Sequence, residues 1–219
     1  MVISSKIIQR HLSGHMNFIR QAETARRYFA NQNDIKTDNH VIQRAAEVES
    51  ELGNPLRTAD NRISHDWHSL LVTQKVAYAL SFPPVFDVGQ KSHNARISEI
   101  LGDHYTSTAV QLGIDASNTG VGWLHYWTDE TGAFCYHTVD PVQIIPIFSG
   151  TLDSKLIGVL RCYIMDDPKT GQQKQICEAW DNTCVRYYEQ NTYGNYAYFS
   201  YPEIGQEMAH GMGAVPFIP

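Results

Sequence analysis

Positive charge is scarce in this sequence. Its 219 residues include 17 Lys and Arg against 23 Asp and Glu, and the formal net charge is -6 with neutral histidines. Proteins that hold duplex DNA tightly depend on many contacts of Lys and Arg with phosphates. The charge balance therefore argues against tight binding of duplex DNA as the main task of the chain, although it leaves room for loose contact.

Cysteine motifs and long apolar runs are also lacking. The four cysteines contain no C-x-x-C pair, so neither a zinc ribbon nor a thioredoxin-type site is indicated, and we expect free thiols in a reducing compartment. The first residues hold no apolar block of signal-peptide length, and no later stretch approaches the length of a membrane span. These absences predict a soluble, intracellular protein without a membrane partner.

Sequence motifs of nucleotide-binding and hydrolytic sites are missing as well. Neither G-x-x-x-x-G-K-[ST] nor G-x-S-x-G occurs. Gly120-Val121-Gly122 begins like a dinucleotide fingerprint, but Trp123 follows where a further glycine and a helix are required. The carboxylate pairs Asp129-Glu130 and Asp166-Asp167 stand near Gly or Pro, where Asp is favoured by turns. We therefore expect a protein that is not an enzyme and has no cofactor.

Two histidines are candidates for metal chemistry. His65 and His68 lie three residues apart on a predicted helix and could share a metal ion with Asp66 or Glu99. No third ligand stands at a recognisable spacing, so a polar helix face explains the pair more simply. We expect no metal, and keep a metal-dependent hydrolase that uses His65 and His68 as an alternative.

Other reactive or aromatic side chains lie on predicted strands. Cys135 and His137 share one side of a strand and could form a thiolate and imidazole pair, although a half-buried strand face is the simpler explanation. Tyrosines near the end of the chain could stack on bases or sugars, but strands also select Tyr for packing. Packing is the favoured interpretation, and a β-rich module for glycans or single-stranded nucleic acid is the alternative. The tyrosines are Tyr187, Tyr188, Tyr193, Tyr196, Tyr198 and Tyr201.

The segment from Asn118 to Pro146 organises the predicted fold. Two runs rich in aromatic and β-branched residues flank Asp129-Glu130-Thr131-Gly132, which predicts a β-hairpin whose largely apolar faces need cover on both sides. Asp140-Pro141 then turns the chain, and Pro146 predicts an edge position for the run from Val142 to Phe148. Alternation places four residues on one face of the first strand: Val121, Trp123, His125 and Trp127.

Helical patterns precede the hairpin. An apolar stripe predicts a helix from Ser13 to Ala30, and a short helix is predicted from His40 to Leu52. Ser64 is the predicted cap of the next helix, which ends before Phe82-Pro83-Pro84. A fourth helix is predicted from Asn94 to Leu112 and ends at Gly113. The predicted buried side of the third helix is Ile63, Trp67, Leu70, Leu71, Ala77 and Tyr78.

The second half of the chain is predicted to be β-rich. Short runs between turn signals predict four strands: Leu156 to Met165, Gln173 to Trp180, Cys184 to Tyr188 and Tyr196 to Tyr201. A helical N-terminal half followed by an antiparallel β meander is an α+β fold. We place the boundary between a mainly helical segment, residues 1–115, and a β-rich segment, residues 116–219. The apolar end at Pro219 is typical of a chain cut within a longer structure.

Several short motifs follow one another in a characteristic order. The first half contains Arg27-Tyr28-Phe29, Asn33-Asp34-Ile35, Asn61-Arg62-Ile63 and Phe82-Pro83-Pro84-Val85. The second half contains the run from Ala116 to Gly122, Asp129 to Gly132, Val139-Asp140-Pro141, Ile144-Ile145-Pro146 and the closing segment from His210 to Pro216. This order resembles the N-terminal region of portal proteins from tailed phages of the long-tailed siphophage type, with Ser81 in the place of a family glycine.

The resemblance implies the wing region of a portal, with the stem and clip regions expected downstream. It implies a structural subunit of a ring of about twelve copies at the capsid vertex, with double-stranded DNA passing through the channel during packaging and ejection without sequence specificity. The implied partners are further copies of the chain, the terminase large subunit, a head-tail adaptor, and capsid and scaffold proteins. The implied location is the virion, preceded by the host cytoplasm during assembly. Candidates for core or subunit contacts are Trp67, Trp123, Trp127 and the cluster from Tyr187 to Tyr201.

Overall fold

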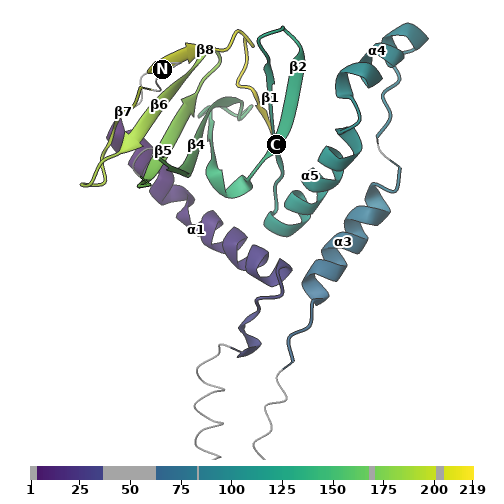
Figure 1. Cartoon of the computed structure of the whole chain (residues 1–219), viewed down its shortest axis with the longest axis horizontal. Helices are drawn as coiled ribbons and strands as arrows, with labels where there is room; N and C mark the ends of the chain where they lie inside the picture. The colour runs from purple at the N-terminus through teal and green to yellow at the C-terminus, as the bar shows by residue number, and fades with distance from the viewer. Residues whose placement is uncertain (1–3, 37–62, 83, 168–170, 201–204) are drawn as a thin grey trace, which may run out of the picture.

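The computed structural model describes residues 4–36, 63–82, 84–167, 171–200 and 205–219 (Figure 1). Its helices are α1 (Ser5–Phe29), η1 (Asp34–Lys36), α3 (Trp67–Ala79), α4 (Lys91–Leu101), α5 (Tyr105–Thr119) and η2 (Pro141–Gln143). Antiparallel strands make up most of the second half, which confirms the predicted α+β class. The predicted helix from His40 to Leu52 lies outside the described residues.

The strands form two antiparallel sheets where the sequence predicted one meander. The small sheet has the order β2-β1-β9, and consists of β1 (Trp123–Thr128), β2 (Phe134–Val139) and β9 (Phe217–Ile218). The large sheet has the order β3-β4-β5-β6-β7, with β8 paired to β6. Its strands are β3 (Ile144–Phe148), β4 (Leu156–Asp166), β5 (Gln173–Trp180), β6 (Cys184–Gln190), β7 (Tyr196–Tyr198) and β8 (Glu207–Ala209).

Local turn chemistry is the part of the β structure that the sequence predicted best. The hairpin of β1 and β2 forms as expected, with Gly132 at a φ of 80° and the Asp129 carboxylate accepting hydrogen bonds from the backbone N–H groups of Thr131 and Ala133. The strand that contains Pro146 is an edge strand, as predicted. Strands β8 and β9 were missed because two or three residues are too few to show alternation.

The large sheet is covered on both faces. Helix α1 packs on one face, where Ile8 meets Leu160 and Tyr188, and the small sheet packs on the other face, where Trp123 meets Val159 and Phe217. Figure 1 shows α1 running along the large sheet and the small sheet beside it. The two cores therefore share the large sheet, and Trp123 is a core residue.

Helix α1 begins at Ser5, eight residues before the predicted start at Ser13. Its first turns are held by tertiary contacts that no local pattern reveals. The backbone N–H of Tyr196 donates to Ser5 Oγ at 2.9 Å, and Gln9 Nε2 donates to the Gly194 carbonyl at 2.8 Å. Ile8, which is fully buried against the sheet, adds the apolar anchor of the same end.

The predicted buried side of α3 is wrong. The side chains predicted to be buried are exposed, and α3 buries Val72 and Val76 instead. The reason lies on α5, where a Cβ atom added to Gly113 would lie 3.1 Å from a methyl group of Val76. The helix has apolar residues all round, so the missing side chain of Gly113 decides which side packs.

Two predicted helix ends are also wrong. The predicted helix from Asn94 to Leu112 is broken at Gly102, which has a φ of 63°, and α5 runs through Gly113 to end at Thr119 before Gly120, at a φ of 91°. Glycine has no Cβ, so it adopts a positive φ without strain. The predicted boundary between the helical and the β-rich segment, at residues 115 and 116, falls inside α5. The division into two segments stays a prediction.

Ser64 does not cap α3. The N-cap residue is Asp66, and the Ser64 hydroxyl instead accepts a hydrogen bond from Asn33 Nδ2 at 2.8 Å. It also lies 2.5 Å from Asn31 Oδ1, to which it donates. Ser64 therefore ties the start of the α3 segment to the residues that follow α1.

Candidate subunit interface

Large apolar side chains are exposed along one helical region of the chain. We call residues 63–101, Pro83 excepted, the apolar arm; it contains α3, the following loop and α4. Tyr78 is 89% exposed and Val85 is 88% exposed, and apolar surface of this extent on a folded protein marks sites of protein interaction. The exposed large apolar residues of the arm are Ile63, Trp67, Leu70, Leu71, Tyr78, Phe82, Val85, Phe86, Val88 and Ile100.

The arm owes its position to α5. Figure 1 shows α3 beside α5 on the side away from the sheets, and α4 beyond the upper end of α5. The end of α4 contacts the small sheet, since Tyr136 Oη on β2 donates to the Leu101 carbonyl at 2.5 Å. Val72 and Val76 pack toward Gly113, and His68 Nε2 lies 2.7 Å from the Asn118 side-chain oxygen. These contacts fix one side of α3, and its opposite side, which carries Leu71, therefore faces outward.

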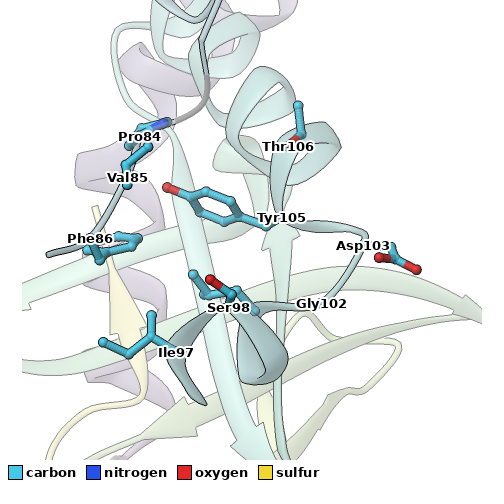
Figure 2. A pocket seen from close by; sticks show the side chains of 10 residues that line it. Pro84, Val85, Phe86, Ile97, Ser98, Gly102, Asp103, Tyr105 and Thr106 are labelled. Carbon is cyan, nitrogen blue, oxygen red and sulfur yellow. The ribbon is translucent and has the colours of Figure 1, made fainter. Parts of the chain in front are cut away.

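A shallow groove of about 370 Å³ lies where the loop after α3 meets α4 and α5. Figure 2 shows the Tyr105 ring pointing towards the loop residues Val85 and Phe86, with Ile97 and Ser98 of α4 nearby. The Phe86 and Tyr105 rings are 6.0 Å apart between centroids, and burial raises the pKa of Tyr105. The groove is lined by apolar side chains such as Ile97 together with polar ones such as Asp103, so it suits a side chain of a partner protein that has an apolar body and a polar end.

The two candidate metal histidines have different contacts in the structure. His65 is exposed and its ring lies 6.3 Å from the Trp67 ring, whereas His68 contacts Asn118. Glu99 pairs with Arg96 at 2.7 Å. Among the described residues, no group of three or more His, Cys, Asp or Glu side chains could hold a metal ion. The geometry thus gives the hydrolase alternative no support.

The remaining chemical candidates have structural roles. His137 Nδ1 lies 2.8 Å from the Thr138 carbonyl, and the sulfur of Cys135 lies 3.8 Å from the Ala133 carbonyl, so the structure does not bring these two side chains together as a catalytic pair. Gly122 allows a close approach, since a Cβ atom there would lie 2.8 Å from the Leu112 carbonyl oxygen. The four cysteines are free, as expected.

The carboxylate pairs act as turn and ion-pair residues. The hydrogen bonds of Asp129 close the turn of the β1–β2 hairpin, and hydrogen bonding from Thr131 lowers the pKa of Asp129. Asp167 forms an ion pair with Lys174, whose Nζ lies 3.5 Å away. The described contacts of Asp129 and Asp167 are therefore those of a turn and of an ion pair.

Most of the tyrosine cluster packs into the fold. Tyr187, Tyr188 and Tyr196 are buried, which confirms the packing interpretation for these three, whereas Tyr193 and Tyr198 are exposed. Tyr201 lies outside the described residues. A module that binds glycans or single-stranded nucleic acid would need a surface of exposed tyrosines. Of this cluster, the described residues leave only the rings of Tyr193 and Tyr198 exposed.

The buried charge between the two sheets is fully partnered inside the fold. The Glu178 carboxylate accepts hydrogen bonds from Tyr163 Oη at 2.8 Å and Trp180 Nε1 at 3.0 Å, and it pairs with Arg161 Nη1 at 3.3 Å. The Arg161 guanidinium also lies over the Tyr163 ring, 4.4 Å from its centroid. This cluster stabilises β4 against β5 from within the fold, whereas the large apolar side chains of the arm are exposed in the described part of the chain.

Sequence reasoning singled out Trp67 but missed the loop residues of the groove. The available signal was the run from Phe82 to Val88, which holds four large apolar residues around two prolines in a segment with no helical or strand period. Apolar residues outside a regular element are not placed in a core by periodicity, so such a run favours a contact surface.

Among the described residues, no helix joins the length and the apolar character that crossing a membrane requires.

An α+β scaffold with an uncovered apolar arm fits the class of structural subunits that assemble with other proteins. The chain belongs to the family of phage portal proteins, SPP1 Gp6-like, whose family model matches residues 8–219. It is 35% identical over 209 residues to the portal protein of Clostridium phage phiCD119, covering 89% of this chain and 44% of that relative. It is 28% identical over 200 residues to the portal protein of Bacillus phage SPP1, covering 88% of this chain and 39% of the relative.

The chain thus spans less than half the length of either relative. Family membership confirms the resemblance in the order of the sequence motifs, and it makes this chain a portal-family segment of structural type.

Proposed function

We propose that this chain is the wing segment of a portal subunit, and that its apolar arm packs against a neighbouring copy in a ring at the capsid vertex. The observation that carries the proposal is the exposed apolar surface of the arm, which includes Trp67, Leu71 and Val85. A residue such as Leu contributes roughly 1.5–3 kcal/mol when it moves from water into an apolar contact. A surface of this kind in a ring-forming family is best explained by contact between subunits.

A closed ring needs a heterologous contact, in which two different patches of the same chain meet. The exposed side of α3 presents projecting side chains, and the groove where the arm meets the start of α5, beside Tyr105, presents a hollow. In the proposed ring, the arm of one copy contacts the adjacent copy, while the sheets stabilise each subunit from within. About twelve copies would form the ring, in line with the resemblance.

The proposed role in the whole protein is passage of double-stranded DNA, without sequence specificity, during packaging and ejection. A net charge of -6 is compatible with sliding, because a channel that neutralised many phosphates would hold DNA in place. The proposed docking partners are the terminase large subunit, a head-tail adaptor, and capsid and scaffold proteins. The proposed role includes no catalysis, and the proposed location is the virion after assembly in the host cytoplasm.

Electron microscopy of the full-length gene product tests this proposal. Negative-stain images are expected to show rings with a central channel and roughly twelvefold symmetry. Monomers or dimers at every salt concentration tested would contradict the ring. Rings that persist unchanged when Trp67, Leu71 and Val85 are all replaced by Asp would contradict the arm as the contact between subunits.

A further inference from the structure

Two cysteine thiols face each other inside the large sheet. Cys162 on β4 and Cys177 on β5 are direct partners in the antiparallel register, and their sulfur atoms lie 3.2 Å apart. Opposite residues in antiparallel strands have Cα atoms about 4.5 or 5.5 Å apart, depending on the kind of pair. Both distances fall within the range of about 4.4–6.8 Å that disulfides use. The backbone therefore already has the spacing of a cross-strand disulfide.

The two thiols differ in access. Cys177 is fully buried in the core beneath α1, next to Ala179 and Leu160, whereas Cys162 is only partly buried at the margin of the same core. The contact with Cys162 and burial both raise the pKa of the Cys177 thiol. A dissolved oxidant therefore meets Cys162 first, and Cys177 completes the reaction from within the sheet.

We propose that Cys162 and Cys177 form an oxidation site, at which a disulfide oxidant such as oxidised glutathione links β4 to β5 in the folded protein. In the first step the Cys162 thiolate attacks one sulfur of the oxidant, and one glutathione thiolate leaves. In the second step the Cys177 thiolate attacks the Cys162 sulfur and expels the second glutathione thiolate. The two cysteines lose two protons and two electrons, and the oxidant is reduced to two thiols.

This inference does not depend on the proposed function. Its consequence is a covalent tie across the sheet that carries both cores, available wherever the reducing systems of a cytosol are absent. The disulfide closes a loop that contains the turn between β4 and β5, so it restricts the unfolded chain and stabilises the fold. The other two thiols, Cys135 and Cys184, have no cysteine opposite them in the strand register.

The experiment incubates the folded protein with oxidised glutathione and then counts free thiols in urea with a maleimide. Two of the four thiols are expected to disappear. Tryptic cleavage gives peptides 162–169 and 175–186, which should be found joined, with fragmentation assigning the link to Cys177 and not to Cys184. The thermal midpoint is expected to rise by about 5 °C or more after oxidation.

Matched variants sharpen the result. Cys162→Ser should keep three free thiols and gain no thermal stability, whereas Cys135→Ser should still form the link. The mapping of the unaltered chain stands without either variant should one fail to fold. Four free thiols after treatment, a link to another cysteine or another molecule, or a link that forms only in urea would each overturn the proposal.

Discussion

The large sheet and the apolar arm contain similar side chains but differ in how far they bury them. Leu160 on β4 is fully buried between α1 and its neighbouring strands, whereas Leu71 on α3 is 63% exposed. The same contrast holds for charge, because Glu178 is buried with three partners while Glu99 forms an exposed pair with Arg96. The core of the sheet is thus covered by the described chain, whereas the large apolar side chains of the arm stay exposed to solvent.

The largest expected difference in the free energy of unfolding is between the same Leu→Ala substitution at two positions. Leu160→Ala should lower the free energy of unfolding by about 2–5 kcal/mol, because it removes buried methyl groups and leaves a cavity. Leu71→Ala should change the same quantity by less than about 0.5 kcal/mol, because water already contacts most of that side chain. Urea unfolding followed by circular dichroism measures both. Equal losses would show that the arm is part of the folding core.

A second pair of variants compares the charges. Glu178→Gln should cost about 1–3 kcal/mol, since it leaves the half-buried Arg161 guanidinium without its counter-charge and disturbs the hydrogen bonds of Tyr163 and Trp180. Glu99→Gln should cost less than about 0.5 kcal/mol, because its ion pair with Arg96 is exposed. The same unfolding experiment applies. A cost for Glu99→Gln that matched Glu178→Gln would remove the distinction between the two regions.

A third variant tests what the arm is for. Leu71→Asp should leave unfolding nearly unchanged but weaken assembly of the full-length protein by about tenfold or more, because a charge would be buried at the contact. Analytical ultracentrifugation gives the assembled fraction. Leu152→Asp is the matched control, since Leu152 is a fully exposed leucine in the loop between β3 and β4, outside the arm. Loss of assembly in the Leu152→Asp control, but not in Leu71→Asp, would contradict the arm as the interface and indicate the loop between β3 and β4 instead.

The smallest expected effect concerns pH. Burial between the sheets lowers the pKa of His125 below its ordinary value of 6.5, and this outweighs the hydrogen bond to the Pro216 carbonyl and the nearby Glu178. The unfolded chain therefore binds the proton more readily, so stability is kept above about pH 6.5 and declines as the pH falls below that value. Burial also lowers the pKa of His15, which adds to the same decline.

His125→Asn keeps a donor towards the Pro216 carbonyl and removes the titrating ring. Thermal midpoints between pH 7.5 and 5.5 should then fall less steeply than in the unaltered chain, though not become flat, because His15 remains. His93→Asn, at an exposed position of α4, is the control and should leave the slope unchanged. A slope that is equal in all three proteins would contradict the role of His125.

Several elements of the β region were predictable because their causes are local. Asp129 and Gly132 specify the hairpin turn by side-chain hydrogen bonding and positive φ, and Pro146 requires an edge strand because it lacks an N–H group. The buried side of α3 was not predictable in this way. That helix carries apolar residues on every side. The burial of Val72 and Val76 depends on Gly113, some forty residues away along the chain.

The candidate interface could be predicted only in part for the same reason. Trp67 was identified as a residue of either the core or a subunit contact, and only the packing of α3 on α5 leaves it 63% exposed. Trp123, identified on the same grounds, is a core residue. Burial of an aromatic side chain is favourable both in a core and in a subunit contact. The sequence around the residue therefore does not indicate which of the two buries it.

By itself, the sequence determined the α+β class, the hairpin, the edge strand and, through the order of its motifs, the portal family. These features depend on residues close together in the chain or on their order along it. Only the tertiary structure decided that the strands form two sheets, that Cys162 meets Cys177, and that α3 packs Val72 and Val76 inward and leaves Leu71 exposed. Those outcomes depend on which distant surfaces pack most closely, and side-chain shape at the contact sets that choice.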